Sequence, residues 1–203
     1  MTRRFDPKTT ALLICDLQND YVHPDGAYAR GGAANDTIAA VPARVKVAAD
    51  AVRAAGGWIV ATKFTLVPGK GGEPLIPSQL KRLRPFLRKG DFAPGAWGHD
   101  LIETLKPADL VVEKVATSGF YMSRLEFVLR KAQIETLAIC GISTNGGVAS
   151  TLRDAHGRDF PCVLLTDGCA AFDPRIHDAT IAELSAVVTT MTCADFAAAI
   201  TAP

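Results

Sequence analysis

Short apolar runs alternate with amphipathic helical patterns along the whole chain, and this alternation restricts the fold more than any other feature. Apolar runs of this length are typical of strands buried on both faces of a parallel sheet. They cover residues 11–15, 58–62, 110–113, 136–140, 161–166 and 186–190. Helical patterns lie between them at residues 36–55, 122–131, 146–158 and 176–184. Six strands joined by crossover helices predict an α/β fold: one Rossmann-like, doubly wound domain over residues 1–203, with helices on both faces of a mostly parallel sheet.

Composition excludes several classes of protein. The 203 residues carry 22 basic and 21 acidic side chains, a net charge of +1, so neither a nucleic acid nor a membrane surface is an expected partner. The first apolar run, residues 11–15, is too short to cross a bilayer. Five cysteines with no paired spacing indicate reduced thiols, and we therefore expect a cytoplasmic protein.

One segment, residues 68–96, interrupts the alternation with prolines, glycines and a run of basic side chains. It is long for a connection inside a compact domain, and such segments are often lids or binding loops. A solvated loop with a short surface helix is the alternative, and the sequence leaves both open. The basic side chains in and next to this segment either form a solvated face or contact a substrate carboxylate. They are Lys63, Lys70, Lys81, Arg82, Arg84 and Arg88.

A small set of residues follows the predicted strands, at the edge where ligands bind in doubly wound sheets. If the strand order is 3-2-1-4-5-6, the first and fourth strands are neighbours. Asp16 then faces the Gly146–Gly147 turn directly, and Lys114 is able to approach it. The full set at this edge is Asp16, Lys63, Phe64, Lys114, the glycine-rich stretch 141–147 and Asp167.

Asp16 follows five apolar or thiol residues, so its carboxylate begins in a partly desolvated place. A buried carboxylate is costly unless it is paired with a cation or protonated, and Lys114 is the obvious cation. Such a pair is either a structural ion pair or part of an active site. A third reading makes Asp16 the cap of a neighbouring turn that contains Gln18 and Asn19.

The stretch 139–148 (Ile-Cys-Gly-Ile-Ser-Thr-Asn-Gly-Gly-Val) runs from a strand through a tight turn into a helix that begins near Gly146. Backbone N–H groups at a helix start are unpaired and can hold an anion or a developing oxyanion. Gly146 and Gly147 are the main candidates for this role, with Ile142 and Ser143 just before them. No histidine is placed in the sequence to activate the Ser143-Thr144 hydroxyls as nucleophiles, so we expect them to hold the turn.

Three blocks at the ends of predicted strands match the motifs of a known family in the same order. They are residues 11–19 (ALLICDLQN), 112–120 (VEKVATSGF) and 141–155 (GISTNGGVASTLRDA). In these blocks the chain resembles the isochorismatase-like hydrolases, the cysteine-hydrolase superfamily. The resemblance implies that Asp16 is the catalytic acid or base and that Lys114 is catalytic. It also implies a non-proline cis peptide between Ile142 and Ser143, and a homo-oligomer.

Gly147 is the main departure from the family. Most members of the superfamily carry a catalytic cysteine at this position, and glycine cannot attack a carbonyl. True isochorismatases, which cleave an enolpyruvyl ether, resemble this chain in having glycine there. They differ at Phe64, where they place a glutamine, and at residues 115–117, where Val-Ala-Thr replaces their Trp-Arg-Tyr. The chain is therefore most similar to a subgroup with Gly in place of the nucleophilic Cys.

The strand ends and the family blocks together predict a substrate pocket. Its expected residues are Asn19, Lys63, Phe64, Phe120 and Asn145. Nicotinamidase-like relatives bind a metal through an aspartate and paired histidines after the second strand. Here residues 62–65 read Thr-Lys-Phe-Thr and the four histidines are scattered, so we expect neither a metal nor a cofactor.

The expected function is hydrolysis of a small anionic molecule without a covalent intermediate. Asp16 acts as a general acid on an enol-ether carbon or on the leaving group, Lys114 orients it, and water completes the reaction. A nearby Lys⁺ lowers the pKa of an aspartate, so this role requires burial or an anionic substrate to raise it. Two alternatives remain. One is a non-catalytic small-molecule-binding protein that lost its nucleophile, and the other is a cysteine amidohydrolase whose nucleophile at Gly147 has been replaced.

The five cysteines carry a separate expectation. Cys15, Cys140 and Cys162 fall on predicted strands and are expected to be buried, unreactive and high in pKa. Cys169 is expected after the fifth strand, where it reacts slowly, and Cys193 near the last helix. None of them is expected to replace the missing nucleophile.

Overall fold

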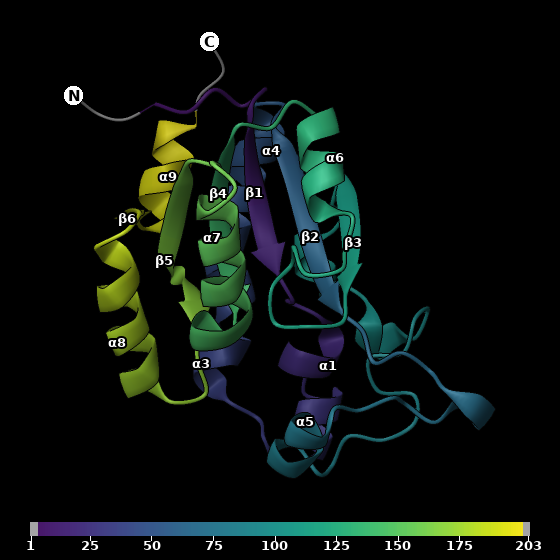
Figure 1. Ribbon diagram of the computed structural model, residues 1–203. Coiled ribbons are helices and arrows are strands. Elements are labelled where there is room, and N and C mark those ends of the chain that lie inside the picture. The colour runs from purple at the N-terminus through teal and green to yellow at the C-terminus, as the bar shows by residue number, and fades with distance from the viewer. Residues whose placement is uncertain (1–3, 201–203) are drawn as a thin grey trace.

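The computed structural model describes residues 4–200, and a six-stranded sheet forms its centre (Figure 1). Neighbouring strands pair in the order β3-β2-β1-β4-β5-β6, and every pair is parallel. The predicted fold class and strand order are therefore confirmed. The strands are β1 (Thr10–Cys15), β2 (Trp58–Phe64), β3 (Leu110–Lys114), β4 (Thr136–Ile142), β5 (Cys162–Ala170) and β6 (Thr189–Met191).

Helices cover the sheet on both sides. In Figure 1, α6 and α7 lie in front of the sheet and α4 lies behind it. No described helix is long and apolar enough to cross a membrane. The helices are α1 (Asn19–Val22), α2 (Ala27–Arg30), α3 (Asp36–Ala39), α4 (Val41–Ala54), α5 (Ser78–Leu83), α6 (Leu125–Lys131), α7 (Ala149–His156), α8 (Pro174–Ser185) and α9 (Cys193–Ala199), with short turns η1 (Lys70–Gly72), η2 (Trp97–His99), η3 (Glu103–Leu105) and η4 (Thr144–Val148).

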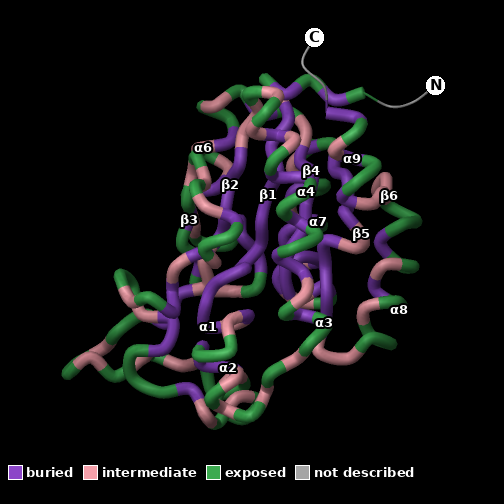
Figure 2. The backbone as a smooth tube through the Cα atoms, turned by 180° about the vertical axis from the view of Figure 1, so that it is seen from behind, coloured by how far each residue is buried: buried purple, intermediate pink, exposed green. Residues whose placement is uncertain are grey.

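The strands are buried because helices cover both of their faces. All six residues of β1 are buried, and Figure 2 shows the central strands in the buried colour. A strand that is buried on both faces is apolar at successive positions, so it forms a continuous apolar run in the sequence. This explains why the apolar runs predicted most of the strands. Two strands differ most from the predictions. β6 covers Thr189–Met191 rather than 186–190. β5 extends to Ala170 through an irregularity in its pairing with β4, where the register jumps from Ile139–Leu164 to Gly141–Cys169. Cys169 is therefore part of the strand, and the prediction that it follows the strand was wrong.

The helix boundaries also differ from the predictions. The pattern at residues 36–55 forms two helices, since α3 ends at Ala39 and α4 begins at Val41, with Pro42 in its first turn. The first of them is capped by Asn35, whose side chain accepts from the Ile38 amide at 3.0 Å. The pattern at 122–131 is shorter than expected, since Met122 has a φ of 49° and the helix begins at Leu125.

The segment 68–96 contributes Leu87 and Phe92 to a second, small hydrophobic cluster, which also contains Ala27, Tyr28 and Leu66. A buried carboxylate fixes this cluster, because the two oxygens of Asp20 accept from the amides of Ala27 at 3.0 Å and Phe92 at 2.7 Å. Figure 1 shows α5 below the carboxyl ends of the strands. The segment is therefore packed where a lid would lie, and α5 is its ordered part.

His99 provides a pH test of this packing. Its ring is buried, its Nε2 lies 2.8 Å from the Thr65 hydroxyl oxygen, and burial lowers its pKa from the ordinary 6.5, with Lys63 acting in the same direction. Below pH 6.5 the unfolded chain binds a proton at this ring while the folded protein stays neutral. We therefore expect this contribution to the free energy of unfolding to decrease as pH falls below 6.5.

Urea unfolding at several pH values between 5 and 8 would measure the contribution of His99 to the free energy of unfolding. His99→Gln is the comparison, because glutamine cannot titrate. The stability of wild type relative to His99→Gln is expected to fall with pH. A difference between the two proteins that stays constant from pH 8 to pH 5 would contradict the assignment.

Candidate active site

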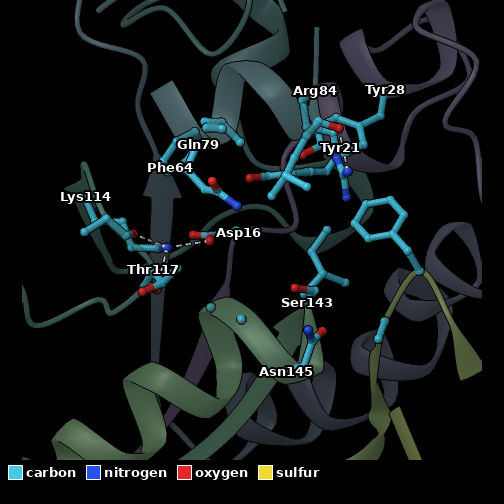
Figure 3. A pocket seen from close by; sticks show the side chains of 18 of the residues that line it. Asp16, Tyr21, Tyr28, Phe64, Gln79, Arg84, Lys114, Thr117, Ser143 and Asn145 are labelled. Carbon is cyan, nitrogen blue, oxygen red and sulfur yellow. Dashed lines mark hydrogen bonds and ion pairs between the residues drawn. The ribbon is translucent and has the colours of Figure 1, made fainter. Parts of the chain in front are cut away.

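A cavity of about 600 Å³ lies at the carboxyl ends of the strands. Its walls come from the ends of β1, β2 and β4, from the loop after β3, from α5 and from the connection between β5 and α8. Figure 3 shows Asp16 and Lys114 on one side of this cavity, with Tyr21, Tyr28 and Arg84 across it. The predicted site edge is therefore the place where the protein forms its cavity.

Asp16 directly follows β1 and turns the chain away from the sheet. Its φ is 55°, in the left-handed region that aspartate tolerates better than most residues, and its carbonyl accepts from the Gln18 amide at 2.8 Å. The carboxylate is buried, with Oδ2 2.7 Å from Nζ of Lys114 and Oδ1 accepting from the Thr62 hydroxyl at 2.8 Å. The expected Asp16–Lys114 pair thus forms, and Thr62 is a partner that the sequence did not reveal.

Lys114 is the last residue of β3, and only 2% of it is exposed. Besides the carboxylate, its ammonium donates to the carbonyls of Ala116 and Thr117, both at 2.9 Å. These three acceptors match the three protons of an ammonium group. The positive charge is therefore fully coordinated inside the wall of the cavity.

Burial controls the proton affinity of the Asp16 carboxyl. Removal from water raises its pKa above the ordinary 3.8, and this effect exceeds the lowering caused by the Lys114 charge and by the hydrogen bonds from Lys114 and Thr62. The desolvation of an ion costs several kcal/mol even inside a relaxed protein, so burial is able to outweigh one close cation. Asp16 thus holds a proton at higher pH than an exposed aspartate does.

The turn after β4 has an unusual backbone. The Ile142–Ser143 peptide is cis, as the family resemblance implied, and Gly141 has a φ of 118°. A side chain at Gly141 would collide with the Cys15 carbonyl, so only glycine fits this close approach of β4 to β1. The helix expected to begin near Gly146 is preceded by η4, one turn of π-helix, and α7 begins only at Ala149.

The turn changes which amides are able to bind an anion. The Gly146 amide donates to the Ser143 carbonyl at 3.0 Å, and the Val148 amide donates to the same oxygen at 3.2 Å. Gly146 was expected to offer a free N–H, but the turn uses it. The Ser143 amide has no acceptor in residues 4–200. Ile142, Ser143, Gly146 and Gly147, the residues expected to bind an anion, all line the cavity.

Gly147 lies beside the carboxylate. A Cβ built on it would stand 3.1 Å from Asp16 Oδ2 and 2.8 Å from the Ile142 carbonyl oxygen. A side chain at this position would therefore point at Asp16, which is the place for a nucleophile next to an acid or base. The glycine leaves this space open to a ligand.

Two of the five predicted pocket residues, Phe64 and Asn145, line the cavity. Three do not. Lys63 precedes Phe64 on β2, and successive side chains of a strand point to opposite faces, so Lys63 turns away and lies 3.8 Å from Asp100. The Asn19 side chain donates to the Trp97 carbonyl at 2.8 Å, and Phe120 packs against another ring in the core.

The far wall was missed in the sequence analysis. It is mainly aromatic and aliphatic, with one guanidinium, and its residues are Tyr21, Tyr28, Gln79, Leu80, Leu83, Arg84, Phe172 and Ile176. In the sequence, only Arg84 gave any indication of this wall. It was one of six basic residues, and nothing in the sequence distinguished it from the other five. Asp167, expected at the site edge, instead accepts from the Cys193 amide at 2.7 Å and does not line the cavity.

Neither Thr144 nor any of the five cysteine thiols is an accessible nucleophile that could replace the missing one. His177 does contact Thr144, with 2.8 Å between Nδ1 and Oγ1, so the expectation of no partner histidine was wrong. Thr144 is nevertheless fully buried and does not line the cavity. All five cysteines are free and buried. Burial raises the pKa of Cys15 and Cys162 to about 12, and it raises the pKa of Cys140, Cys169 and Cys193 as well.

No group of three or more His, Cys, Asp or Glu side chains in residues 4–200 is arranged to hold a metal ion. At the cavity, the Asp16 carboxylate and the Lys114 ammonium are paired with each other instead.

Comparison with known proteins identifies relatives over most of the chain. The isochorismatase domain model matches residues 10–195. The chain is 35% identical over 193 residues to a ureidoacrylate amidohydrolase, RutB, of Methylobacterium radiotolerans, covering 88% of this chain and 74% of that protein. It is 36% identical over 184 residues to the protein of the same name from Pantoea ananatis, covering 84% and 73%. A cysteine hydrolase structure from Pseudomonas syringae superposes with a TM-score of 0.82 at 24% identity, covering 96% of this chain and 93% of the other.

Proposed function

Because this chain belongs to the isochorismatase family of hydrolases, we propose that it hydrolyses a small anionic molecule without forming a covalent enzyme intermediate. One observation carries the proposal. Asp16, whose pKa burial raises, faces a glycine at the position where a side chain would attack the substrate. The site therefore combines a proton donor with open space and lacks a nucleophile.

An enol ether of a small carboxylic acid suits this arrangement. Asp16 donates its proton to the terminal carbon of the C=C–O unit, and the adjacent carbon becomes an oxocarbenium ion. Water adds to that carbon and returns one proton to Asp16. The resulting hemiketal releases the alcohol and leaves a ketone, so one water is consumed and the carboxyl is regenerated.

The neighbouring groups support each step. Lys114 holds the carboxyl in place and balances its charge when the proton has left. The Ser143 and Gly147 amides lie on the adjacent wall, where they bind negative charge on the substrate. The missing side chain at 147 gives the reacting carbon access to Asp16 Oδ2.

Amide hydrolysis is the second candidate, because the two curated relatives are named as amidohydrolases. On this chain it would require direct attack by water, since Gly147 has no side chain. Parallel assays with 2-phenoxyacrylate, an enol ether, and with 3-ureidoacrylate, an amide, would separate the two reactions. Release of phenol is the expected result, and turnover of the amide alone would reject the enol-ether proposal.

Thiol alkylation tests the absence of covalent catalysis. We expect native protein treated with iodoacetamide to keep its turnover of 2-phenoxyacrylate, because all five thiols are buried and raised in pKa. Cys169 is included, since it lies inside β5. The label would be mapped by mass spectrometry, with urea-unfolded protein as the control for complete reaction. Rapid stoichiometric inactivation with the label on Cys140 would show that the nucleophile has moved.

A further inference from the structure

We infer that Arg84 binds a carboxylate at the end of the substrate remote from the reacting bond, across the cavity from Asp16, and that it selects a planar conjugated or aromatic carboxylate. The reacting bond is placed at Asp16 by the proposed function, and the inference rests on it for that point only. Figure 3 shows Arg84 reaching into the cavity on the side opposite Lys114.

The charges around the cavity leave Arg84 without an anionic partner. Lys114 is coordinated by Asp16 and two carbonyls, and Asp173 is paired with Arg175 at 2.7 Å. Arg84 forms no ion pair with an acidic side chain in residues 4–200. A guanidinium in the wall of a mainly apolar cavity is therefore available to an anion from outside the protein.

The donors of Arg84 are only partly used. One terminal nitrogen donates to the Leu83 carbonyl at 2.9 Å, while Nε is buried and has no hydrogen-bond partner in the described chain. The guanidinium also lowers the pKa of the Tyr28 hydroxyl through its charge and through a hydrogen bond, although burial raises that pKa by more. A guanidinium has five N–H donors in a planar fork, and a carboxylate accepts two of them side by side.

Aromatic rings hold the guanidinium in position. Its central carbon lies 5.5 Å from the centroid of the Tyr28 ring and 4.9 Å from that of Phe172. The two rings stack at 5.3 Å with an interplanar angle of 21°. Contacts of this kind fix an arginine without neutralising it, so little side-chain entropy is lost when an anion binds.

The position of Arg84 follows from α5, which it ends. Its backbone N–H donates to the Leu80 carbonyl at 2.8 Å, and Gln79, Leu80 and Leu83 of the same helix line the cavity. Lys81, Arg82 and Arg88 do not line it. Of the six basic side chains considered in the sequence, only Arg84 meets the cavity, so the carboxylate contact falls to this residue.

The aromatic side chains of the cavity determine which kind of ligand can lie between Arg84 and Asp16. Tyr21, Tyr28, Phe64 and Phe172 line the same cavity as Arg84 and Asp16. A flat, conjugated body packs on such rings, whereas a flexible polar chain would leave its polar groups unpaired. A carboxylate on Arg84 with a planar body towards Asp16 is the ligand class that fits.

Calorimetric titration with non-reacting probes tests this inference without catalysis. Cinnamate and its neutral amide, cinnamamide, have the same shape and differ in the charged end. Wild type is expected to bind cinnamate more tightly than the amide. Arg84→Met should weaken cinnamate binding by about tenfold or more, the usual worth of hydrogen bonds to a charged group, and leave cinnamamide binding unchanged.

Arg88→Met is the matched control, because it removes the same charge from an exposed arginine that does not line the cavity. It should bind cinnamate as wild type does. Arg84→Lys keeps the charge but not the fork, and intermediate binding is expected; it also serves if Arg84→Met does not fold. Wild-type protein that binds neither probe, or equal cinnamate binding by wild type and Arg84→Met, would overturn the inference. Arg84-dependent binding together with an Asp16→Asn variant of full activity would reject the proposed function alone.

Discussion

Replacing Asp16 by asparagine is expected to lower turnover by at least about 10²-fold, the usual contribution of a positioned general acid. Asparagine is nearly the same size, tolerates a positive φ, and keeps one oxygen for Thr62 or Lys114. The fold is therefore expected to persist, as judged by circular dichroism and by a cooperative thermal transition. What is lost is the exchangeable proton.

The pH profile separates an acid from a structural residue. Because the protonated carboxyl is the active form, wild-type kcat should fall as pH rises through the raised pKa of Asp16. The Asp16→Asn protein should lack this dependence. Asp167→Asn is a suitable control, since it changes a carboxylate on β5 that does not line the cavity. Equal activity of Asp16→Asn and wild type would reject acid catalysis and favour a passive pocket.

The second large effect is expected from Gly147→Cys. The introduced Cβ would lie 3.1 Å from Asp16 Oδ2, with Lys114 behind it, so the carboxylate is placed to take the thiol proton. The same Cβ would lie 2.8 Å from the Ile142 carbonyl oxygen, closer than side chains approach backbone atoms, so the backbone of the turn must shift to admit it. We expect the new thiol to react with iodoacetamide about tenfold faster at neutral pH than an unperturbed exposed thiol.

Gly157→Cys provides that exposed reference, since Gly157 ends α7 and its added Cβ meets only ordinary contacts. Adding Asp16→Asn to Gly147→Cys should remove the rate advantage, because the base is then missing. Intact-mass measurement of label against time would give all three rates. A thiol introduced at 147 that reacts no faster than the one at 157 would show that this position is not activated.

The fold and the first half of the site were predictable for a common reason. Strands buried on both faces give an apolar signal that depends only on local sequence, and the doubly wound order then places Asp16 next to Gly147. The Asp16–Lys114 pair followed from topology and from the cost of burying a lone carboxylate. No knowledge of side-chain packing was needed for either step.

The far wall of the cavity could not be predicted, because it depends on packing between residues that are far apart in the sequence. Tyr28, Arg84 and Phe172 are far apart in sequence, and they meet because α5 folds back over the strand ends. No periodicity encodes that contact. The error at Lys63 has a local origin, since which of two adjacent strand residues faces the cavity is set by where the strand ends.

The fate of solvent hydrogen in the product tests the central claim most directly. Wild-type protein would be given 2-phenoxyacrylate in D2O, and the released pyruvate would be examined by mass spectrometry before its methyl group exchanges with solvent. Protonation of carbon by Asp16 predicts one deuterium in the methyl group of each product molecule, formed at least about 10²-fold faster than with Asp16→Asn. Phenol release without deuterium on that carbon, or release by both proteins at the same rate, would contradict the account.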